Sequence, residues 1–451
     1  MRSILLIQNK SQGIKTFPLG LSYLGTYLTK YNIDVTIFDM NIYQNPFKKL
    51  KKLLDKNFTL IGISLRNLDL YTPVYGPRNY LKYIRKNANL NELERLIMFS
   101  KAKKPNTKLI IGGAGFTILA KELMDKYKNM DFGIVGQSEI TLTELIKNIE
   151  NPEKVKGIYY RRGNKVFYTG KGENIKNIDF IPEKNIKGFG NLKIYDSKIY
   201  DSVGVQTKRG CTFKCAHCVE PYIQEGPLIL RDIGSVIKEV REIKNNHGIS
   251  NIMFTDSVIN YPVKNFKQLC KAIINNNIKI RWRGYFRFEH LNKDLVKLAV
   301  KSGCDGFVFS PDSGSEKIRK RLGINLENER IIGIIKELKK CDGNINVFIS
   351  FFLNSPGETI ATLIKTLFLA FKLKRINNKI DMDFSIIRIY PNTLIYDQLN
   401  VIKKKNILKP FLYNPFPLKL FTVPFLVSYY FLKNGFQTPI LNFLASKKIE
   451  L

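Results

Sequence analysis

Cysteine is scarce in this chain, and the few cysteines are unevenly placed. There are six in 451 residues, and three of them lie between Cys211 and Cys218. So few cysteines in so long a chain do not make a disulfide framework. We therefore expect a reducing compartment and a metal site.

Long apolar runs are also missing. The longest uncharged apolar stretch extends from Leu420 to Leu432 and contains Pro424, which is well short of the roughly 20 residues needed to cross a bilayer. The N-terminal residues lead directly into a short apolar strand at Ile4, without the apolar length or cleavage site of a signal peptide. We therefore expect a cytoplasmic protein.

Acidic residues are few relative to basic ones. Asp and Glu total 38 against 73 Lys and Arg, which gives a formal net charge of +35. Such a charge is typical of proteins that bind nucleic acids or anionic membranes. Here, however, lysine is spread along the whole chain among many Ile and Asn residues, which indicates compositional bias of the genome. We therefore do not expect a nucleic-acid partner.

The apolar residues that are present predict more than one folded unit. A hydrophobic content of 44% in 451 residues is ample for two or three domains. In residues 1–150, short apolar runs alternate with amphipathic stretches, which predicts an α/β fold with a doubly wound, Rossmann-like domain. The predicted strands of this domain are 4–7, 35–38, 60–64, 109–111 and 132–135.

Several of these predicted strands end in a polar residue or a glycine, namely Asp39, Ser64, Gly112–Gly113 and Gly136. The carboxyl ends of parallel strands are where open α/β sheets bind ligands, so we expect a binding site at this edge. No G-x-G-x-x-G motif follows any of the strands, which argues against a dinucleotide.

Three further regions follow. Residues 151–195 are expected to be a linker with a hairpin turn at Gly163–Asn164. Residues 196–395 predict a partial (β/α)6 barrel of the TIM type, and residues 396–451 a small helical region interrupted by prolines. The predicted barrel strands are 202–206, 251–255, 280–285, 306–310, 346–353 and 384–389.

The three clustered cysteines have the spacing C-x3-C-x2-C, as Cys211, Cys215 and Cys218. Three thiolates on one loop can bind three irons of a [4Fe-4S] cluster, which leaves the fourth iron open. Zinc is the alternative, since C-x2-C pieces beside a histidine often bind it. It is disfavoured because His217 lies between two of the cysteines and the chain has no second C-x2-C pair.

The segment from Lys208 to Cys218 resembles the radical SAM superfamily, in which an aromatic residue precedes the last cysteine; His217 holds that position. The resemblance implies that the open iron binds S-adenosylmethionine (SAM), which the cluster cleaves to a 5′-deoxyadenosyl radical. It further implies that His217, Asp256, Ser257, Asp312 and Ser313 lie near SAM.

Two later motifs extend this resemblance. Ser355 to Thr359 resembles the Pro-Gly-Glu-Thr stretch of the family, and Tyr390 to Thr393 resembles its Pro-Gly-Thr stretch. For Glu358 we favour a capping role at a helix N-terminus, because Ser355 and Glu358 have the spacing of a capping box. Arg283 and Arg287, on the third predicted barrel strand, could each reach a carboxylate of SAM or of substrate, or form a surface salt bridge. The sequence singles out no general acid or base.

An α/β domain ahead of such a core resembles the cobalamin-binding subfamily, and Pro18 to Leu24 matches its first helix. The resemblance implies cobalamin contacts from strand ends of the first domain, at Ser64, Arg66, Gly112, Gly113, Gly136 and Glu139. The chain has three histidines and none lies in this domain, so none of its side chains can supply an axial imidazole. Arg66 would then block the lower axial position or remain a solvated loop residue.

The resemblance implies an enzyme with a [4Fe-4S] cluster, SAM and cobalamin, and an external electron donor of the flavodoxin or ferredoxin type. We expect methylation of a carbon centre, or secondarily phosphorus, in a small-molecule or lipid precursor. The alternatives are cyclisation or rearrangement without methyl transfer, RNA modification, and corrinoid sensing. The aromatic C-terminal region could cap the active site, bind an oligomer partner or lie on a membrane; packing on the barrel is the expectation.

Overall fold

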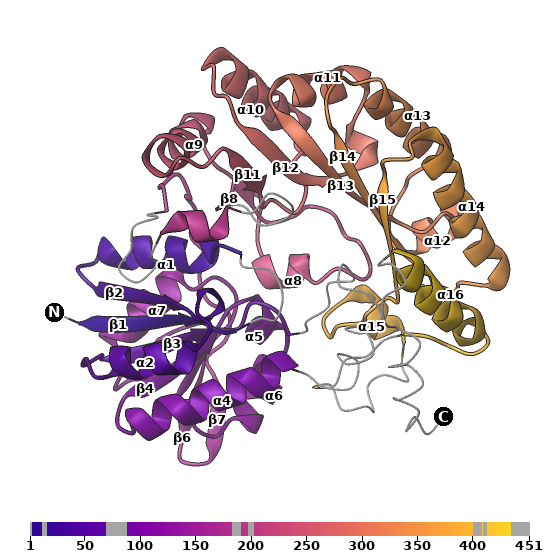
Figure 1. Cartoon of the computed structure of the whole chain (residues 1–451). Coiled ribbons are helices and arrows are strands. Elements are labelled where there is room, and N and C mark those ends of the chain that lie inside the picture. The colour runs from indigo at the N-terminus through magenta and orange to yellow at the C-terminus, as the bar shows by residue number, and fades with distance from the viewer. Residues whose placement is uncertain are drawn as a thin grey trace.

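The computed structural model describes residues 2–10, 16–68, 88–182, 191–196, 203–399, 408 and 413–433. Within them, a seven-stranded sheet is followed by a six-stranded sheet and a short helical region (Figure 1). This confirms the predicted fold class. Ser202, part of the linker and most of the residues beyond 399 lie outside the described residues.

The first sheet has the strand order β2-β1-β3-β4-β5-β6-β7, and its first five strands are parallel. Both faces of these strands are covered, because nearly all their side chains are buried. The five predicted strands are confirmed as β1 (Ser3–Gln8), β2 (Asp34–Asp39), β3 (Leu60–Ser64), β4 (Lys108–Gly112) and β5 (Phe132–Ile134).

The helices of this unit alternate with its strands. They are α1 (Leu19–Thr29), α2 (Pro46–Leu54), α4 (Ala88–Lys103), α5 (Ala114–Ile118), α6 (Ala120–Lys126) and α7 (Glu139–Lys147), with 3-10 turns η1 (Met40–Ile42) and η3 (Pro152–Lys154). The strand order reverses direction between β1 and β3, and such a reversal opens a crevice at the carboxyl ends of the strands.

The predicted hairpin forms, but it continues the first sheet instead of standing in a linker. Strand β6 (Ile158–Arg162) pairs antiparallel with β5, and β7 (Lys165–Tyr168) pairs with β6. Ring stacking of Tyr159 on Tyr168, with centroids 4.6 Å apart, adds to the pairing. The hairpin therefore covers the edge that β5 would otherwise leave open.

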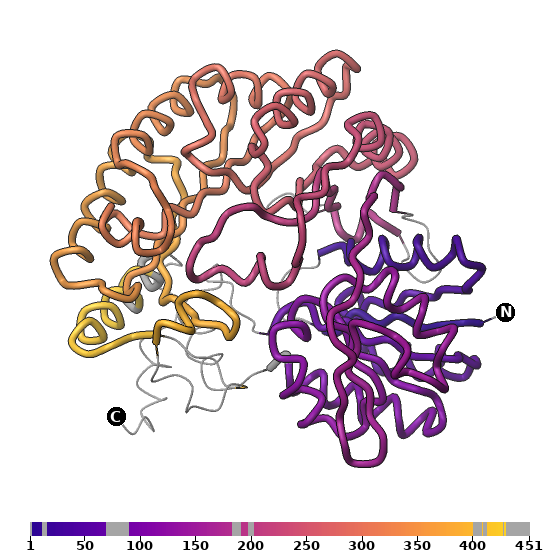
Figure 2. Tube along the Cα trace, turned by 180° about the vertical axis from the view of Figure 1, so that it is seen from behind, coloured from indigo at the N-terminus to yellow at the C-terminus, as the bar shows by residue number. Residues whose placement is uncertain are grey.

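The second sheet is entirely parallel, in the order β15-β14-β13-β12-β11-β8. It curves as an open barrel with its helices on the outer side (Figures 1 and 2). The strands are β8 (Val203–Val205), β11 (Asn251–Phe254), β12 (Arg281–Phe286), β13 (Cys304–Asp312), β14 (Asn346–Phe352) and β15 (Asp381–Ser385).

The helices of the barrel are α9 (Ile233–His247), α10 (Val263–Asn275), α11 (Lys293–Lys301), α12 (Glu316–Arg321), α13 (Asn328–Lys339) and α14 (Ile360–Ile376). Shorter elements are α8 (Glu220–Gln224), the antiparallel pair β9 (Lys208–Arg209) and β10 (Ile229–Leu230), η4 (Leu192–Tyr195) and η5 (Phe288–His290). Helix α8 lies between the two sheets (Figure 1).

The last barrel strand was predicted too late in the chain. Strand β15 begins at Asp381, three residues before the predicted start, and ends at Ser385. The prediction followed the apolar run that begins at Phe384, whereas the register with β14 pairs Phe348 with Asp381. Pairing with a neighbouring strand therefore decided the position of this edge strand, not hydrophobicity.

The described C-terminal residues form α15 (Leu394–Gln398) and α16 (Leu418–Lys433), with Pro424 inside α16. Helix α16 packs on the edge of the barrel, where the Phe384 ring lies 5.3 Å from the Phe425 ring and 4.9 Å from the Tyr429 ring. The predicted packing on the barrel is confirmed for this helix. No described helix has the length and apolarity that a membrane crossing requires.

Candidate functional site

The cysteine loop follows β9 at the carboxyl ends of the barrel strands. Cys211, Cys215 and Cys218 are all free thiols and partly accessible. Two backbone hydrogen bonds at Ala216 hold the loop. Its N–H donates to the Leu322 carbonyl (2.9 Å), and its carbonyl accepts from the Ile395 N–H (2.9 Å). The end of α12 and the start of α15 thus fix the middle of the loop.

Burial favours the neutral form of the three thiols, whereas two of them accept hydrogen bonds that favour the thiolate form a metal cluster needs. Burial raises the pKa of all three, and that of Cys218 to about 12. Cys215 Sγ accepts a hydrogen bond from Arg287 Nη1 (3.3 Å), and Cys218 Sγ accepts one from the Glu220 N–H (3.5 Å). Such donors stabilise thiolates, and bound metal deprotonates a thiol outright.

The spacing of the thiols suits a cluster better than a single ion. Among the residues that the structure describes, no three His, Cys, Asp or Glu side chains converge closely enough to hold one metal ion. In a [4Fe-4S] cluster each thiolate binds a different iron, so the ligands stand farther apart than the ligands of one ion. The three cysteines could therefore hold such a cluster.

His217 and Asp312, two residues predicted to lie near SAM, come together beside this loop. His217 Nε2 lies 3.5 Å from Asp312 Oδ2, and the His217 ring makes an edge contact with Phe352. Asp312 adopts the left-handed conformation, with φ of 66°, where the pairing of β13 and β14 shifts register. Strained residues of this kind cluster at functional sites. Burial raises the pKa of the Asp312 carboxyl.

Ser257 lies beside the loop as well. Its hydroxyl donates to Glu220 Oε1 (2.8 Å), two residues after Cys218. Burial raises the pKa of the Glu220 carboxyl, which the Ser257 hydroxyl partly offsets. The pair therefore places a polar group between α8 and the end of β11.

The other two residues predicted near SAM are engaged within the protein. Asp256 accepts hydrogen bonds from the Thr207 N–H (2.8 Å) and from Lys208 Nζ (3.2 Å), and all three residues are buried. The Ser313 hydroxyl lies 3.2 Å from that of Thr366 in α14 and is fully buried. Both side chains therefore brace the barrel in this structure, and only His217, Ser257 and Asp312 gather at the cysteine loop.

The predicted capping role of Glu358 is wrong. The capping box of helix α14 lies four residues later than predicted, where the Thr359 and Thr362 side chains each accept a hydrogen bond from the backbone N–H of the other. Glu358 is buried instead, and this burial raises the pKa of its carboxyl to about 7. Thr362 therefore holds the N3 position that a glutamate or glutamine occupies in the usual capping box.

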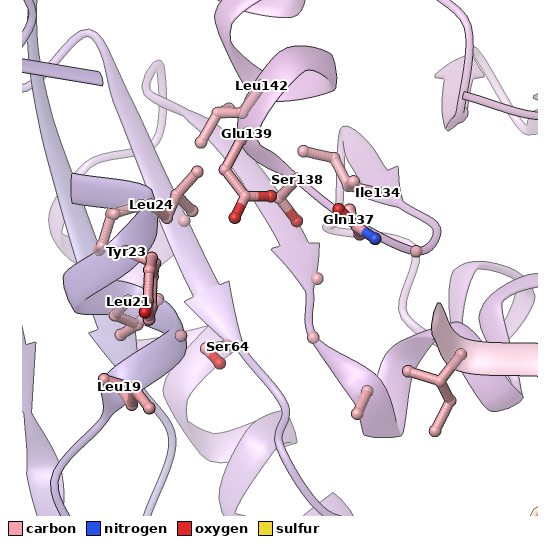
Figure 3. Close-up of a pocket in the computed structure, with 18 of the residues that line it drawn as sticks. Leu19, Leu21, Tyr23, Leu24, Ser64, Ile134, Gln137, Ser138, Glu139 and Leu142 are labelled. Atoms are coloured by element: carbon pink, nitrogen blue, oxygen red, sulfur yellow. The ribbon is translucent and has the colours of Figure 1, made fainter. Parts of the chain in front are cut away.

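A cavity of about 250 Å³ lies at the carboxyl ends of the first sheet. It is lined by Ser64, Gly112, Gly113, Gly136 and Glu139, all predicted cobalamin contacts. In Figure 3, Tyr23 and Leu24 of α1 face Glu139 and Leu142 of α7 across this cavity, with Ser64 at the end of a strand. Arg66 is exposed outside the cavity and donates to the Thr16 hydroxyl.

Glycine is needed at this edge because a side chain would have too little room and because the backbone adopts a positive φ. A Cβ on Gly113 would lie 2.8 Å from the Leu65 carbonyl, and the residue has φ of 98°. A Cβ on Gly112 would meet Ile134 and Ser138 only at 3.8 Å, so a larger side chain there would fill the cavity. The cavity thus has a glycine floor that fits a bulky ligand.

The wall of the cavity comes from the second unit. Gln206, Arg209, Ile223 and Gln224 line it, so the residues on both sides of the cysteine loop reach the first sheet. Arg209 Nη1 donates to Glu139 Oε1 (2.8 Å) in a buried ion pair. The site is therefore one crevice between two units.

Sequence reasoning missed three features of this site. Glu220 and the wall residue Arg209 stand within three residues of a cysteine, so proximity to the motif was a usable signal for both. The contact of Arg287 with Cys215 had no such signal, because 72 residues separate them. Only the fold brings that pair together.

Comparisons with known proteins agree with this geometry. Residues 10–146 match the model of the B12 binding domain, and residues 205–370 match the model of the radical SAM superfamily. An uncharacterized methyltransferase of Pyrococcus horikoshii is 25% identical over 391 residues, which is 84% of this chain and 78% of the relative.

Two further proteins are similar over most of the chain. The cytidylyl-2-hydroxyethylphosphonate methyltransferase of Streptomyces wedmorensis is 24% identical, over 76% of this chain and 71% of its own. The structure of the radical SAM methyltransferase TsrM from Kitasatospora setae, with tryptophan and a SAM analogue, superposes with a TM-score of 0.74 at 19% identity, over 88% of this chain and 75% of its own. With a B12-binding domain ahead of a radical SAM core, this chain belongs to the cobalamin-dependent radical SAM enzymes.

Proposed function

We propose that this enzyme methylates a carbon centre, with phosphorus as the second choice, in a small-molecule or lipid precursor. The observation that carries the proposal is the shared crevice. Its floor is the glycine edge of the B12-binding domain, and its wall, at Arg209 and Ile223, flanks the cysteine loop. A corrinoid and a cluster bound to these residues would therefore face each other across one cavity.

Different residues of the chain would bind the cluster and SAM. Cys211, Cys215 and Cys218 would hold the cluster, while His217 and Asp312 would meet SAM. When bound, the cluster and SAM supply one-electron chemistry, and cobalamin supplies a transferable methyl group. The cavity of about 250 Å³ would take part of a corrinoid.

The relatives support methyl transfer over the alternatives. Both curated relatives described above are named methyltransferases, and the one from Streptomyces wedmorensis is named for a small phosphonate. The TsrM structure holds tryptophan, another small molecule. A one-electron reductant of the flavodoxin or ferredoxin type would complete the system.

The test is anaerobic reconstitution with iron, sulfide and hydroxocobalamin, followed by reductant and methyl-labelled SAM. We expect about four irons per chain, a bound corrinoid spectrum, and label in the corrinoid or 5′-deoxyadenosine in solution. Nucleoside product without bound corrinoid would contradict methyl transfer. Copurifying RNA that takes up the label would favour RNA modification instead.

Two variants separate the two halves of the site. Cys218→Ala should lose the cluster, whereas Cys341→Ala, outside the loop, should retain it. Gly112→Leu should fill the crevice and lower cobalamin binding at least about tenfold while the iron content stays the same, because steric exclusion from a filled pocket costs more than 1.4 kcal/mol. Gly333→Leu is the matched control, because a Cβ there meets nothing within 4 Å.

A further inference from the structure

The outer face of α14 is apolar. Ile360, Ile364, Phe368 and Phe371 are 38%, 58%, 66% and 61% exposed. Steps of four, four and three residues place these side chains along one face of the helix. The opposite face, with Leu363, Leu369 and Leu373, packs on the barrel. Helix α14 is thus apolar on both sides, although only one side is buried.

Two other helices of the barrel, α10 and α13, do not share this property. The exposed positions of α10 are Lys264, Lys267, Gln268, Lys271 and Asn275, and those of α13 are Glu329, Arg330, Gly333, Lys336 and Lys339. A helix that covers a sheet needs one apolar face. The outer stripe of α14 is therefore not explained by packing of the barrel, and a contiguous exposed apolar patch marks an interaction site.

The C-terminal helices carry further exposed apolar side chains. Leu394 in α15 and Phe416, Leu420 and Phe421 at α16 are 55%, 76%, 59% and 49% exposed. Both views place α14 and α16 beside each other at one end of the barrel (Figures 1 and 2). The end of the barrel that carries the stripe of α14 therefore exposes further apolar side chains.

The charged residues of α14 and α16 are all basic. The sequence has no acidic residue between Glu358 and Asp381, or between Asp397 and Glu450. Lys365, Lys372 and Arg375 stand exposed in α14 next to the apolar stripe. Long basic side chains that flank an apolar face can extend to anionic headgroups while the apolar groups enter the acyl boundary.

We infer that the outer face of α14 docks this enzyme on an anionic membrane surface. Two copies of the chain facing each other would oppose Lys365, Lys372 and Arg375 with their own counterparts, and this repulsion disfavours a self-dimer. A nucleic acid would engage the lysines and leave Phe368 and Phe371 in water. An anionic bilayer satisfies both the charge and the apolar stripe.

The test uses the full chain, reconstituted anaerobically, and vesicles of phosphatidylcholine alone or mixed with phosphatidylglycerol. We expect sedimentation with the mixed vesicles, weakened by high salt, and little with phosphatidylcholine alone. Phe368→Ser/Phe371→Ser should lower the partition coefficient about tenfold or more, since two phenyl rings then leave the acyl boundary. Phe167→Ser/Tyr168→Ser, at an aromatic pair of β7 that is 41% and 47% exposed, should leave it unchanged.

A fluorescent probe gives an independent measurement. The single native tryptophan, Trp282, is fully buried, so its emission is a constant background. Emission of a Phe368→Trp variant should shift to the blue with the mixed vesicles and be quenched by brominated lipid.

Three outcomes would overturn the inference: no binding to either vesicle, equal binding to both, or a solution dimer that Phe368→Ser/Phe371→Ser dissociates. Circular dichroism and iron content would verify that each variant is folded. Since no turnover is measured, failure here leaves the proposed methyl transfer untouched.

Discussion

Arg287 places a guanidinium group between a predicted cluster ligand and a carboxylate. Its Nη1 donates to Cys215 Sγ (3.3 Å), its Nε donates to Glu289 (3.2 Å), and its guanidinium carbon lies 4.2 Å from the centre of the Phe213 ring. A hydrogen bond and a positive charge at a cluster sulfur stabilise the added electron. We therefore expect Arg287 to raise the reduction potential of the bound cluster.

Replacing Arg287 with alanine should lower that potential by tens of millivolts, on the order of other changes in hydrogen bonding at cluster sulfurs. Arg287→Lys, which keeps the charge and loses the forked geometry, should lower it less. Electron paramagnetic resonance during a redox titration measures both. Arg283→Ala, in β12 and paired with Asp305 (3.1 Å), is the control. An unchanged potential in Arg287→Ala would contradict the assignment.

Glu358 should make stability depend on pH. Its folded pKa of about 7 lies above the ordinary value of 4.5, because burial favours the neutral acid. The native state then binds the proton more tightly than the unfolded state. The resulting stability is full below about pH 4.5 and is lost as pH rises through 7, by roughly 3 kcal/mol at most. Urea unfolding at several pH values should show this loss in the wild type and not in Glu358→Gln; parallel curves would contradict it.

At the scale of secondary structure, the sequence predicted the elements that a local residue pattern determines. The buried runs of β1 to β5 are apolar on both faces and therefore unmistakable as strands. The pairing of the hairpin with β5 and the early start of β15 depend on partners distant in the sequence, which no local pattern contains. The same holds for the site: the spacing of the cysteines is local, whereas the engagement of Asp256 by Thr207 needs the fold.

The cap of α14 illustrates how a local prediction can miss by one helical turn, since it lies at Thr359 and not at Ser355, and it offers a test. Thr359 Oγ1 accepts from the Thr362 N–H (3.3 Å), and Thr362 Oγ1 accepts from the Thr359 N–H (2.8 Å). Thr359→Ala should therefore cost about 1 kcal/mol of unfolding free energy. Ser355→Ala, at the position predicted earlier as the cap, should cost less. Urea unfolding would decide, and the reverse order would refute this cap.

At the scale of the whole molecule, the two units are joined by polar contacts as well as by apolar packing. Arg209 pairs with Glu139 and also donates to Gln137 (3.1 Å), while Arg231 donates to the Tyr23 hydroxyl (3.0 Å) and pairs with Glu239 (2.6 Å). These groups are buried or nearly so. Because a buried charge must remain paired, the contacts fix the B12-binding domain against the cysteine loop.

The Arg209–Glu139 pair should therefore behave as a unit. Glu139→Leu alone leaves a buried guanidinium without its carboxylate and should cost about 3–5 kcal/mol, whereas Arg209→Met/Glu139→Leu should recover most of that loss. Unfolding free energies of the two single variants and the double variant measure the coupling. If the losses simply add, the pair does not couple the units. Cobalamin affinity in the double variant then tests whether binding needs this ion pair, since both side chains line the crevice. Retained affinity would mean that the apolar contacts suffice to hold the two sides of the crevice in place.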